Sequence, residues 1–575
     1  MGKMTLFEKF SFLKPVLSRL FKLLNKRQKA LMAFMLVLII GFSLVETIGI
    51  SAIMPFISVV SNPSLLEDGI YKKAYELFNF SSTQKFIIIF GIAIIIFYIF
   101  RGIYFIILSY LTKKYSNSIY KYFAKKALKI NLSVPYKVHA QKNTGELMHA
   151  IGGETKEIGT VVFNLLYFLT EIFSVLMVYA LIIFLNWKMT LILTCILFIF
   201  IIIFMSYLTR VNSKQGKIRF ITQRKMSRSL KESLGNIKYV KLKGNEEEVI
   251  KTYNDALESN AKSELITDVL NSMPKGVLES LGFSFLIGVV ITIVWLSNDA
   301  SIVIPIISMY ALALYRILPS VHRLLINLNK IVYGEEIIKN VYENLNQKYE
   351  EEGSVPVNFE SSIRLENINF KYMTGNEIIS NLSLEIKKGD KTAFTGESGG
   401  GKSTLIDIIT GIHKPISGNI YIDNTLLTNE NIRSWRKKIG YIPQSVYLFD
   451  GTVAENVSFG SDYNEDKIIT ALKKANIWDF LSQKEGINTL VGDGGIQLSG
   501  GQQQRICIAR AIYDDPEVLV LDEATSALDN ETEQRIMDEI YSVSTNKTLL
   551  VIAHRLTTVE RCDRRICIKD GMIEL

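Results

Sequence analysis

Six long apolar stretches fill most of the first 330 residues and limit the possible folds more than any other feature. Each reaches the about 20 residues that a helix needs to cross a bilayer. Only helices and closed barrels satisfy their backbone hydrogen bonds in lipid, so the pattern predicts six transmembrane helices. The stretches lie at roughly 30–60, 84–112, 159–186, 189–209, 265–297 and 301–330.

The connections between these stretches differ in length and charge. Long basic connections, at 113–158 and 210–264, follow the second and fourth stretches, whereas the turns at 186–188 and 298–300 are short. Because basic loops stay in the cytoplasm, we expect the long loops and both termini to face it. The excess of 65 Lys and Arg over 56 Asp and Glu largely flanks the spans, and no nucleic-acid-binding motif accompanies it. Nucleic acid is therefore not an expected partner.

Two shorter segments also carry a prediction. Residues 1–29 mix Lys and Arg with Phe and Leu and lack a small-residue cleavage site, so they predict an amphipathic lead-in helix. The segment 62–83 predicts a short external helix. The four cysteines form no Cys-x-x-Cys pair and lack histidine neighbours at metal spacing, so neither a disulfide nor a zinc site is expected.

Ionisable residues inside the spans allow two interpretations. Each costs about 2.5–3.5 kcal/mol at the bilayer centre on insertion scales, so it faces a partner or a cavity. The basic residues are Arg101, Lys275, Arg316 and Arg323, and the acidic residues are Glu46, Glu171 and Glu279. These charges can pair with one another or lie at span ends. Alternatively, Arg316 and Arg323, on one helical face about 10 Å apart, can bind an extended anion such as a diphosphate.

The composition changes after the sixth stretch. A polar segment, 343–354, leads to Val355 and Pro356, and short β-rich runs with glycine turns follow. We therefore predict a polytopic α-helical membrane domain followed by an α/β P-loop nucleotide-binding domain. The predicted domains are 1–335, with the lead-in helix and cytoplasmic loops, a linker at 336–358, and a nucleotide-binding domain at 359–575.

A strand, a glycine-rich loop and a helix follow one another at 391–410, which is the context of a phosphate-binding loop. The glycines let backbone N–H groups face a β-phosphate, Lys402 reaches the β- and γ-phosphates, and Ser403 offers its hydroxyl to Mg²⁺. The predicted nucleotide-binding residues of this loop are Gly396, Glu397, Ser398, Gly399, Gly400, Gly401, Lys402, Ser403 and Thr404. ATP and Mg²⁺ are the expected cofactors.

Two adjacent carboxylates end an apolar strand. Asp522 follows Val-Leu-Val-Leu and stands where a Walker-B aspartate holds Mg²⁺ through water. Glu523 can orient and deprotonate the attacking water. The alternative interpretation of Glu523 is a surface carboxylate in a salt bridge.

The run 498–502, followed by Gln503, Gln504 and Arg505, resembles the signature sequence of ATP-binding cassette proteins, and the resemblance covers the whole chain. Its residues are Leu498, Ser499, Gly500, Gly501 and Gln502. In that family the signature of one subunit caps the γ-phosphate bound by the other. The resemblance therefore implies a homodimer with two composite ATP sites, in which Ser499 and Gly501 act in trans.

The same resemblance implies four further roles. Tyr372 would stack on adenine, Gln444 would sense Mg²⁺ and the attacking water, Asp529 would cross the dimer interface, and His554 would contact the γ-phosphate. Tyr372 and His554 can also be ordinary residues at strand ends. Gly400 stands where the family more often has Ser, Cys or Ala. No catalytic position is degenerate, so both sites are expected to hydrolyse ATP.

Six spans with long cytoplasmic extensions resemble the type IV exporters, whose coupling helices dock on the ATPase. Within them the chain resembles bacterial lipid-linked oligosaccharide flippases of the PglK and Wzk type. The matching segments are 45–56, 97–101, 311–319 with Arg323, and 491–495. The family has arginine where Lys275 stands.

That resemblance implies a cargo and a location. A polyprenyl-diphosphate-linked oligosaccharide would move from the cytoplasmic to the outer leaflet of a bacterial inner membrane, for glycan assembly. Arg101, Arg316, Arg323 and Lys275 would bind the diphosphate, and the 62–83 helix would engage the polyprenyl tail.

Other cargoes and classes stay open at this point. Export of lipid A-like lipids, peptides or drugs uses the same scaffold, and the intramembrane basic residues argue against drugs but little against a phosphorylated lipid. An ATP-gated channel or regulatory subunit is a further alternative. The intact Glu523 and signature sequence argue against it.

Overall fold

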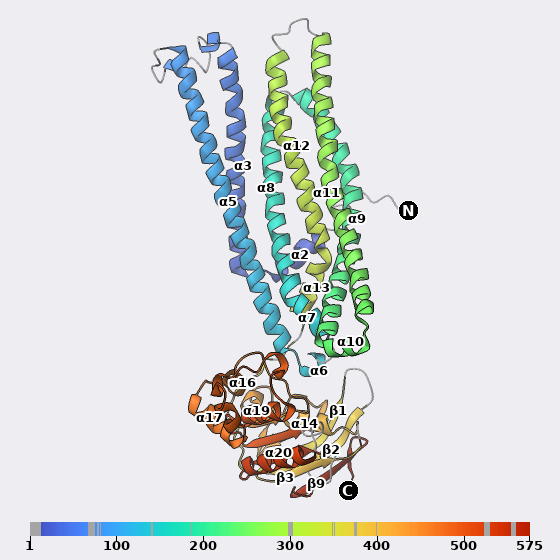
Figure 1. The fold of residues 1–575 in the computed structure, drawn as a ribbon. Coiled ribbons are helices and arrows are strands. Elements are labelled where there is room, and N and C mark those ends of the chain that lie inside the picture. The colour runs from blue at the N-terminus through green and yellow to red at the C-terminus, as the bar shows by residue number, and fades with distance from the viewer. Residues whose placement is uncertain are drawn as a thin grey trace. The chain divides into compact units, whose positions relative to one another are not determined.

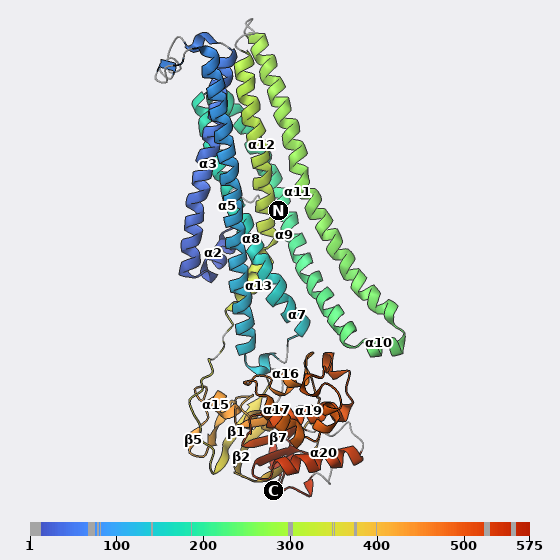
Figure 2. The same cartoon turned by 60° about the vertical axis from the view of Figure 1, so that its left-hand side comes forward.

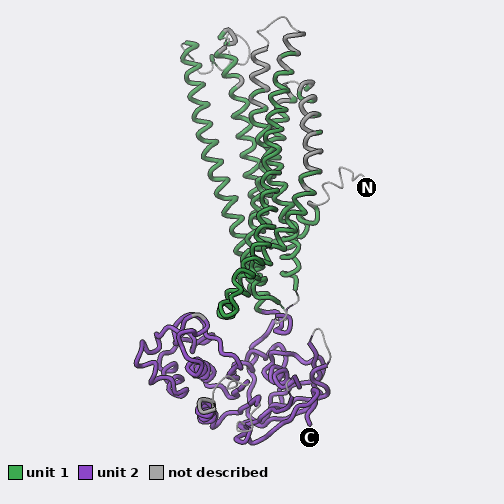
Figure 3. Tube along the Cα trace, turned by 45° about the vertical axis from the view of Figure 1, so that its right-hand side comes forward, with its two compact units in different colours: residues 1–132, 142–347 green, residues 133–141, 348–575 purple. Residues whose placement is uncertain are grey.

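The computed structural model divides the chain into two compact units (Figure 3). The helical unit comprises residues 1–132 and 142–347, and the sheet unit comprises residues 133–141 and 348–575. The structure describes residues 13–61, 63–66, 75–76, 80, 82–139, 142–185, 187–296, 303–347, 349, 351–372, 377–397, 399–522, 530–553 and 559–574.

The helical unit contains long helices that cover the six predicted spans (Figure 1). They are α3 (Lys26–Ser61), α5 (Thr83–Ser133), α8 (Thr155–Leu185), α9 (Trp187–Gly235), α11 (Glu246–Leu296) and α12 (Val303–Tyr333). Among the described residues, three segments are long and apolar enough by composition to cross a membrane, 26–60, 83–133 and 144–181. The other three predicted spans fall in α9, α11 and α12, in which the placement of many side chains is not described.

Three of these helices are much longer than a bilayer is thick. Helix α5 has 51 residues, α9 has 49 and α11 has 51, so each runs for about 75 Å at 1.5 Å per residue. The short helix α10 (Ile237–Lys243) joins α9 to α11, and Gly244 ends it in the left-handed conformation that suits glycine. The two long helices then lie side by side (Figures 1 and 2).

The lead-in segment and the outer segment are partly described. Helix α2 (Leu13–Leu23) buries one apolar edge, including Val16 and Leu20, and lies against α13 (Glu335–Leu345). Within 62–83, a 3₁₀ turn, η1 (Pro63–Leu66), places Leu66 in an apolar cluster with α3 and α5. The remainder of the predicted external helix, and residues 1–12, lie outside the described residues.

A buried carboxylate joins three segments of the helical unit. Glu154 ends a short π-helix, η2 (Ala150–Glu154), which follows α7 (Thr144–His149). Its side chain is fully buried and accepts hydrogen bonds from Arg224 of α9, at 2.8 Å from Nη2 and 3.1 Å from Nε. Asn340 of α13 donates to the other carboxylate oxygen. We call this arrangement the Glu154 junction.

The described strands of the sheet unit form two sheets. The strands of the first run antiparallel in the order β2-β1-β4-β5: β1 (Ser362–Lys371), β2 (Glu377–Lys387), β4 (Ser417–Ile422) and β5 (Thr425–Leu426). The strands of the second follow the order β10-β9-β3-β8-β7-β6: β3 (Lys391–Thr395), β6 (Ile439–Ile442), β7 (Val518–Asp522), β8 (Thr548–Ile552), β9 (Arg564–Lys569) and β10 (Met572–Glu574). Strands β6, β7, β8, β3 and β9 are parallel, and β8 is buried throughout, as expected for a sheet covered on both faces.

Helices cover the sheets of this unit (Figure 2). They are α14 (Lys402–Ile409), α15 (Ile432–Arg436), α16 (Val453–Val457), α17 (Glu465–Lys474), α18 (Trp478–Ser482), α19 (Gly500–Ile512) and α20 (Asn530–Val543), with 3₁₀ turns η3 (Gly486–Asn488) and η4 (Asp493–Gly495). Phe394, Leu405 and Ile408 lie in the core between β3, α14 and the first sheet. The loop segment 133–141, with α6 (Tyr136–His139), also belongs to this unit, and the Tyr136 ring lies 5.7 Å from that of His413.

Candidate functional site

The loop between β3 and α14 has a backbone that only glycine can follow at several positions. Gly396 has a φ of 135°, and a Cβ there would lie 2.1 Å from the Ile568 carbonyl oxygen. Gly399 and Gly401 also have positive φ values, of 85° and 100°. Gly400 does not have a positive φ, which is why a small side chain is acceptable to the backbone at that position. The loop thus runs directly into the amino end of α14, so its backbone N–H groups and those of the first helical turn are available to one phosphate group.

Side chains with phosphate-binding chemistry surround this loop. The Lys402 ammonium donates to the carbonyl oxygens of Gly396, at 3.0 Å, and Glu397, at 2.8 Å, so it lies folded over the loop. Ser403 is exposed on the first turn of α14. The Thr404 hydroxyl lies 3.2 Å from that of Tyr372, which places the predicted adenine-stacking ring beside α14.

The strand register brings the two predicted Mg²⁺ side chains toward the loop. Asp522 of β7 pairs with Ile552 of β8, which pairs with Phe394 of β3. Two strand spacings therefore separate Asp522 from β3, or about 10 Å. Gln444 follows β6, whose Ile442 pairs with Leu521 next to Asp522. All of these positions share the carboxyl edge of one parallel sheet, where ligands bind in open α/β folds.

Two residues near Asp522 were not predicted from the sequence. The Tyr441 hydroxyl donates to Asp522 Oδ2 at 2.8 Å. Asp407 of α14 is half-buried, and burial together with the charge of Asp522 raises the pKa of its carboxyl to about 6. The alternating burial of β6 could have indicated that the Tyr441 side chain points to the same face of the sheet as a site residue. No local sequence pattern identifies Asp407 as a site residue.

The donors at this edge fit Mg²⁺. Mg²⁺ takes oxygen ligands, and in ATPases it is held by one or two side chains together with the phosphates. Asp522 and the Ser403 hydroxyl are oxygen donors of this kind, with Gln444 beyond them. The described residues contain no group of three or more His, Cys, Asp or Glu that could hold a metal without phosphate. This donor set therefore suits an ion that arrives with a nucleotide.

The signature run lies at the amino end of α19. Ser499 is the N-cap: its Oγ accepts from the Gln502 N–H, and Gln502 Oε1 accepts from the Ser499 N–H at 2.9 Å. Leu498 is buried, whereas Ser499 and Gly500 are exposed. Gln503 Nε2 donates to the Gly495 carbonyl oxygen at 2.8 Å and so holds the preceding loop. The exposed helix end, with Gly500 and Gly501 in its first turn, can receive an anion.

Four predicted site residues lie outside the described residues: Ser398, Glu523, Asp529 and His554. Glu523 and His554 directly follow the described positions Asp522 and Ala553.

In the helical unit, one carboxylate holds two of the predicted basic residues. Arg101 of α5 donates to Glu46 Oε1 at 2.5 Å, and Arg316 of α12 donates to Glu46 Oε2. Ser174 of α8 donates to the same oxygen at 2.7 Å. The Glu46 side chain is only 1% exposed, while those of Arg101 and Arg316 are 30% and 18% exposed. The pairing interpretation therefore holds for this cluster, which we call the Glu46 triad.

The other two predicted basic residues behave differently from each other. Arg323 Nε donates to Glu171 Oε1 at 2.5 Å, and its Nη2 lies 3.2 Å from Oε2, so the contact is bidentate. Arg316 and Arg323 therefore contact carboxylates on different helices, α3 and α8. Among the described residues, Lys275 forms no ion pair within 4 Å; it lines a pocket with Glu279.

Two family descriptions match the chain. "ABC transporter transmembrane region" matches residues 29–318, and "ABC transporter" matches residues 379–526. The chain belongs to the ABC transporter family. The predicted fold class, a polytopic helical membrane domain followed by an α/β P-loop nucleotide-binding domain, is confirmed. This ABC exporter is a multi-pass membrane protein that hydrolyses ATP to drive transport.

Several relatives share both parts of this ABC exporter. It is 29% identical over 443 residues to the heterocyst differentiation ATP-binding protein HepA of a Nostoc species, covering 76% of this chain and 72% of the relative. It is 30% identical to an ATP-dependent lipid A-core flippase of Burkholderia thailandensis, covering 75% and 74%. The corresponding flippase of Burkholderia pseudomallei is 33% identical, covering 60% of this chain and 59% of the relative.

A solved structure has the same fold. The structure of a bacterial Atm1-family ABC exporter with ATP bound covers 96% of this chain and 94% of its own, with a TM-score of 0.75 and 23% identity. The more detailed resemblance to lipid-linked oligosaccharide flippases stays a prediction.

Proposed function

We propose that this ABC exporter is an ATP-driven flippase that moves a polyprenyl-diphosphate-linked oligosaccharide from the cytoplasmic to the outer leaflet of a bacterial inner membrane. The observation that carries the proposal is the Glu46 triad. Two guanidinium groups share one carboxylate there, so the cluster keeps a net positive charge within the membrane part. An uncompensated charge in this environment favours an anionic ligand.

The guanidinium groups of the triad have donors to spare. Each carries five N–H groups, and each gives one short hydrogen bond to Glu46. Arg316 Nε is buried and has no hydrogen-bond partner among the described residues. Planar guanidinium groups bind phosphate oxygens in a bidentate manner. A diphosphate that approaches Arg101 and Arg316 therefore meets donors that are already held in place, while Arg323 and Lys275 extend the basic surface.

At the nucleotide site, the residues divide the work. Lys402 and the loop N–H groups bind phosphate oxygens, and Tyr372 packs against adenine. Ser403, Gln444 and Asp522 would hold Mg²⁺, which would neutralise phosphate charge when bound. Glu523 accepts the proton of the attacking water, and His554 contacts the γ-phosphate.

The second half of each site comes from another copy of the chain. Ser499 and Gly501, at the exposed amino end of α19, contact the γ-phosphate that the other copy binds. Asp529 lies at the same interface. The functional form is thus a homodimer with its nucleotide-binding domains in the cytoplasm.

A second candidate cargo is a lipid A-like glycolipid. Relatives of 30% and 33% identity are lipid A-core flippases. Such a lipid also carries phosphate on a sugar and hydrocarbon chains, so the Glu46 triad suits its phosphate by the same chemistry.

The test is leaflet translocation in proteoliposomes that contain the full chain. A fluorescent polyprenyl-diphosphate glycan and a fluorescent lipid A are reconstituted in parallel, with the Glu523→Gln variant as the control that does not hydrolyse ATP. ATP-dependent movement of the polyprenyl substrate alone supports the proposal. Movement of lipid A alone assigns the second candidate, and ATP hydrolysis with movement of neither rejects both.

A further inference from the structure

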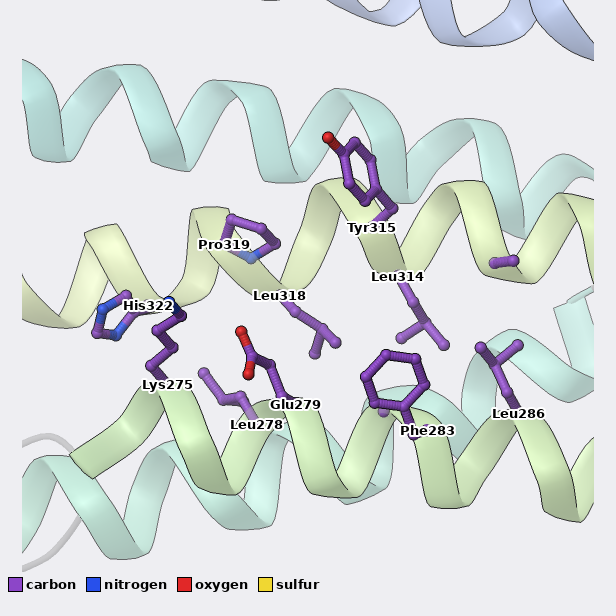
Figure 4. A pocket seen from close by; sticks show the side chains of 12 residues that line it. Lys275, Leu278, Glu279, Phe283, Leu286, Leu314, Tyr315, Leu318, Pro319 and His322 are labelled. Carbon is purple, nitrogen blue, oxygen red and sulfur yellow. The ribbon is translucent and has the colours of Figure 1, made fainter. Parts of the chain in front are cut away.

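A pocket of about 340 Å³ lies between α11 and α12, apart from the Glu46 triad (Figure 4). Its volume falls within the about 300–1,000 Å³ of ligand pockets. Most of its wall is apolar, including Phe283 and Leu286 from α11 and Leu314 from α12. Gly282 lets the helices approach closely, since a Cβ there would lie 2.4 Å from a methyl carbon of Leu318. The pocket is therefore part of the helix packing itself.

Three polar side chains lie at one end of this pocket: Lys275, Glu279 and His322 (Figure 4). In the part of the chain that the structure describes, neither Lys275 nor Glu279 forms an ion pair within 4 Å, whereas the three intramembrane arginines do. The His322 Nδ1 atom is buried and has no hydrogen-bond partner among the residues that the structure describes. An ionisable side chain within a span usually faces a partner or a cavity, and Lys275 and Glu279 are both exposed, so they are accessible to a ligand that supplies an anion and hydrogen-bond donors.

The polar and apolar ends of the pocket are separated along the helix axes, and therefore across the thickness of the membrane. In the topology predicted from the basic loops, α11 runs outward from Glu246 and α12 returns inward to Tyr333, so Lys275 and His322 mark the cytoplasmic end of the pocket. Leu286 lies 11 residues beyond Lys275, or about 16 Å further along the axis. The polar end thus faces the cytoplasmic leaflet and the apolar end faces the bilayer core.

We propose that this pocket, here called the α11–α12 pocket, is the loading site for the lipid cargo while the cargo still has its cytoplasmic-leaflet orientation. Lys275 binds the phosphate, Glu279 accepts hydrogen bonds from hydroxyls of the first sugar, and Phe283, Leu286 and Leu314 hold the proximal hydrocarbon chain. The inference rests on the proposed function and adds to it a site and an orientation. The sequence assigns Lys275 to phosphate and places Glu279 among charges that can pair with one another, but it gives no role to His322 or the apolar wall.

A proline adds a further acceptor at this site. Pro319 lines the pocket within α12 and has no N–H, so the carbonyl oxygen of Tyr315, one turn earlier, lacks its usual helical donor. A sugar hydroxyl or a water molecule can satisfy that oxygen. The pocket therefore offers a cation, a carboxylate and a carbonyl oxygen next to a hydrocarbon slot, which matches a phosphorylated sugar on a hydrocarbon chain.

The ligand chemistry has two sources, an isoprenoid phosphate and an acyl-chain phospholipid, and one experiment distinguishes them. The full chain in nanodiscs is irradiated with farnesyl diphosphate that carries a diazirine at the chain end, and in parallel with a diazirine-labelled dilauroyl phosphatidic acid. Peptide mapping by mass spectrometry then locates the label. We expect farnesyl labelling on peptides that contain Phe283, Leu286 or Leu314, and weaker labelling by the diacyl probe.

Two neighbouring substitutions separate the pocket from the helix surface. Leu286→Trp places an indole in the slot and should reduce labelling about tenfold, because the space is no longer free. Ile287→Trp, at an exposed position that does not line the pocket, should leave labelling unchanged. Glu279→Gln keeps the side-chain volume. It should reduce labelling by a diazirine-labelled farnesyl diphosphate that carries one sugar more than labelling by the sugar-free farnesyl diphosphate. This last variant keeps the inference testable even if Leu286→Trp fails to fold.

The outcomes separate this inference from the proposed function. Equal labelling of the wild-type chain and Leu286→Trp, or label confined to other helices, overturns the α11–α12 pocket even if the protein flips the polyprenyl substrate. Flipping by Leu286→Trp at the wild-type rate overturns its role in loading. Strong labelling by the diacyl probe, together with no flipping of the polyprenyl substrate, rejects the proposed cargo and assigns the pocket to an acyl lipid.

Discussion

In the sheet unit two carboxylates, Asp407 and Asp522, lie near one another, whereas in the helical unit one carboxylate, Glu46, holds two guanidinium groups. The first cluster has an excess of negative charge, and the second has an excess of positive charge. Each imbalance costs free energy in the protein alone and is relieved by a ligand of opposite sign. The comparison indicates that the Asp407 and Asp522 edge of the sheet is arranged for a cation and that the Glu46 triad is arranged for an anion.

The largest expected effect concerns the carboxylates of the nucleotide site. Glu523→Gln removes the proposed base beside Asp522 but keeps its size. ATP hydrolysis should fall about 10²–10⁴-fold, the usual contribution of a general base, while binding of a fluorescent ATP analogue stays unchanged. Hydrolysis at the wild-type rate would reject Glu523 as the base and would move the search to another side chain near Asp522.

The Glu46 triad can be disrupted by removing the negative charge of Glu46. Glu46→Gln leaves Arg101 and Arg316 without a counter-charge, and loss of one partner from a buried pair costs about 3–5 kcal/mol. We expect a clear fall in the thermal unfolding temperature of the purified protein. Glu258→Gln, at an exposed glutamate of α11, is the matched control and should leave that temperature unchanged. Equal stability of the two variants would contradict the structural role of the Glu46 triad.

Arg316→Ala tests whether the positive cluster also binds cargo. Because the nucleotide site is in the other unit, basal ATP hydrolysis should stay within about twofold while lipid translocation falls about tenfold or more, as expected for loss of a charged hydrogen-bonding group. The two activities are measured on the same proteoliposomes. Arg228→Ala removes an exposed arginine that pairs with Glu232 and serves as the control. A parallel loss of hydrolysis and translocation would count against cargo binding.

Tyr441→Phe makes a smaller change on the negative side. It removes the hydroxyl that donates to Asp522, and hydrogen bonds to charged groups contribute about 1.5–3 kcal/mol. The Mg²⁺ concentration for half-maximal ATP hydrolysis should rise, since Asp522 is less well oriented. Tyr447→Phe, at an exposed tyrosine nearby in sequence, should not change it. An unchanged Mg²⁺ requirement in Tyr441→Phe would show that the hydrogen bond has no part in ion binding.

The smallest expected effect is a pH dependence of stability. Burial and Asp522 raise the pKa of Asp407 to about 6, from a usual value near 4. The native state therefore holds this proton more tightly than the unfolded state, and the resulting destabilisation is absent below pH 4, grows up to about pH 6 and is complete above it. Asp407→Asn should raise the unfolding temperature at pH 8 but not at pH 4. An equal rise of the unfolding temperature at pH 8 and pH 4 would show that the effect does not come from the ionisation of Asp407.

The nucleotide site is easier to predict from the sequence than the Glu46 triad. The phosphate-binding loop is readable because its requirements are local: Gly396 and Gly401 need a left-handed backbone, and Lys402 follows directly at the start of α14. The predicted strand 391–395 agrees with β3 for the same reason. The Glu46 triad is not readable as a triad, because Arg101 and Arg316 lie 55 and 270 residues away in sequence.

Features set by tertiary packing were missed for the same reason. The charges themselves are conspicuous in the sequence, because any ionisable residue within an apolar span stands out. The sequence does not distinguish the paired arginines from Lys275, which forms no ion pair with a described residue. Likewise, Asp407 is an ordinary helix position until β7 brings Asp522 close to it. The α11–α12 pocket depends on Gly282 meeting Leu318, which no local pattern shows.

The Glu154 junction has a consequence for how the chain is made. Synthesis proceeds from the amino end, so Glu154 is produced 70 residues before Arg224 and 186 residues before Asn340. The junction therefore cannot close until α12 has been translated and α13 has followed it. A chain that stops short of residue 340 leaves one oxygen of Glu154 without its donor. Completion of this junction thus marks the moment in biogenesis at which the membrane part is whole, before most of the ATPase has left the ribosome.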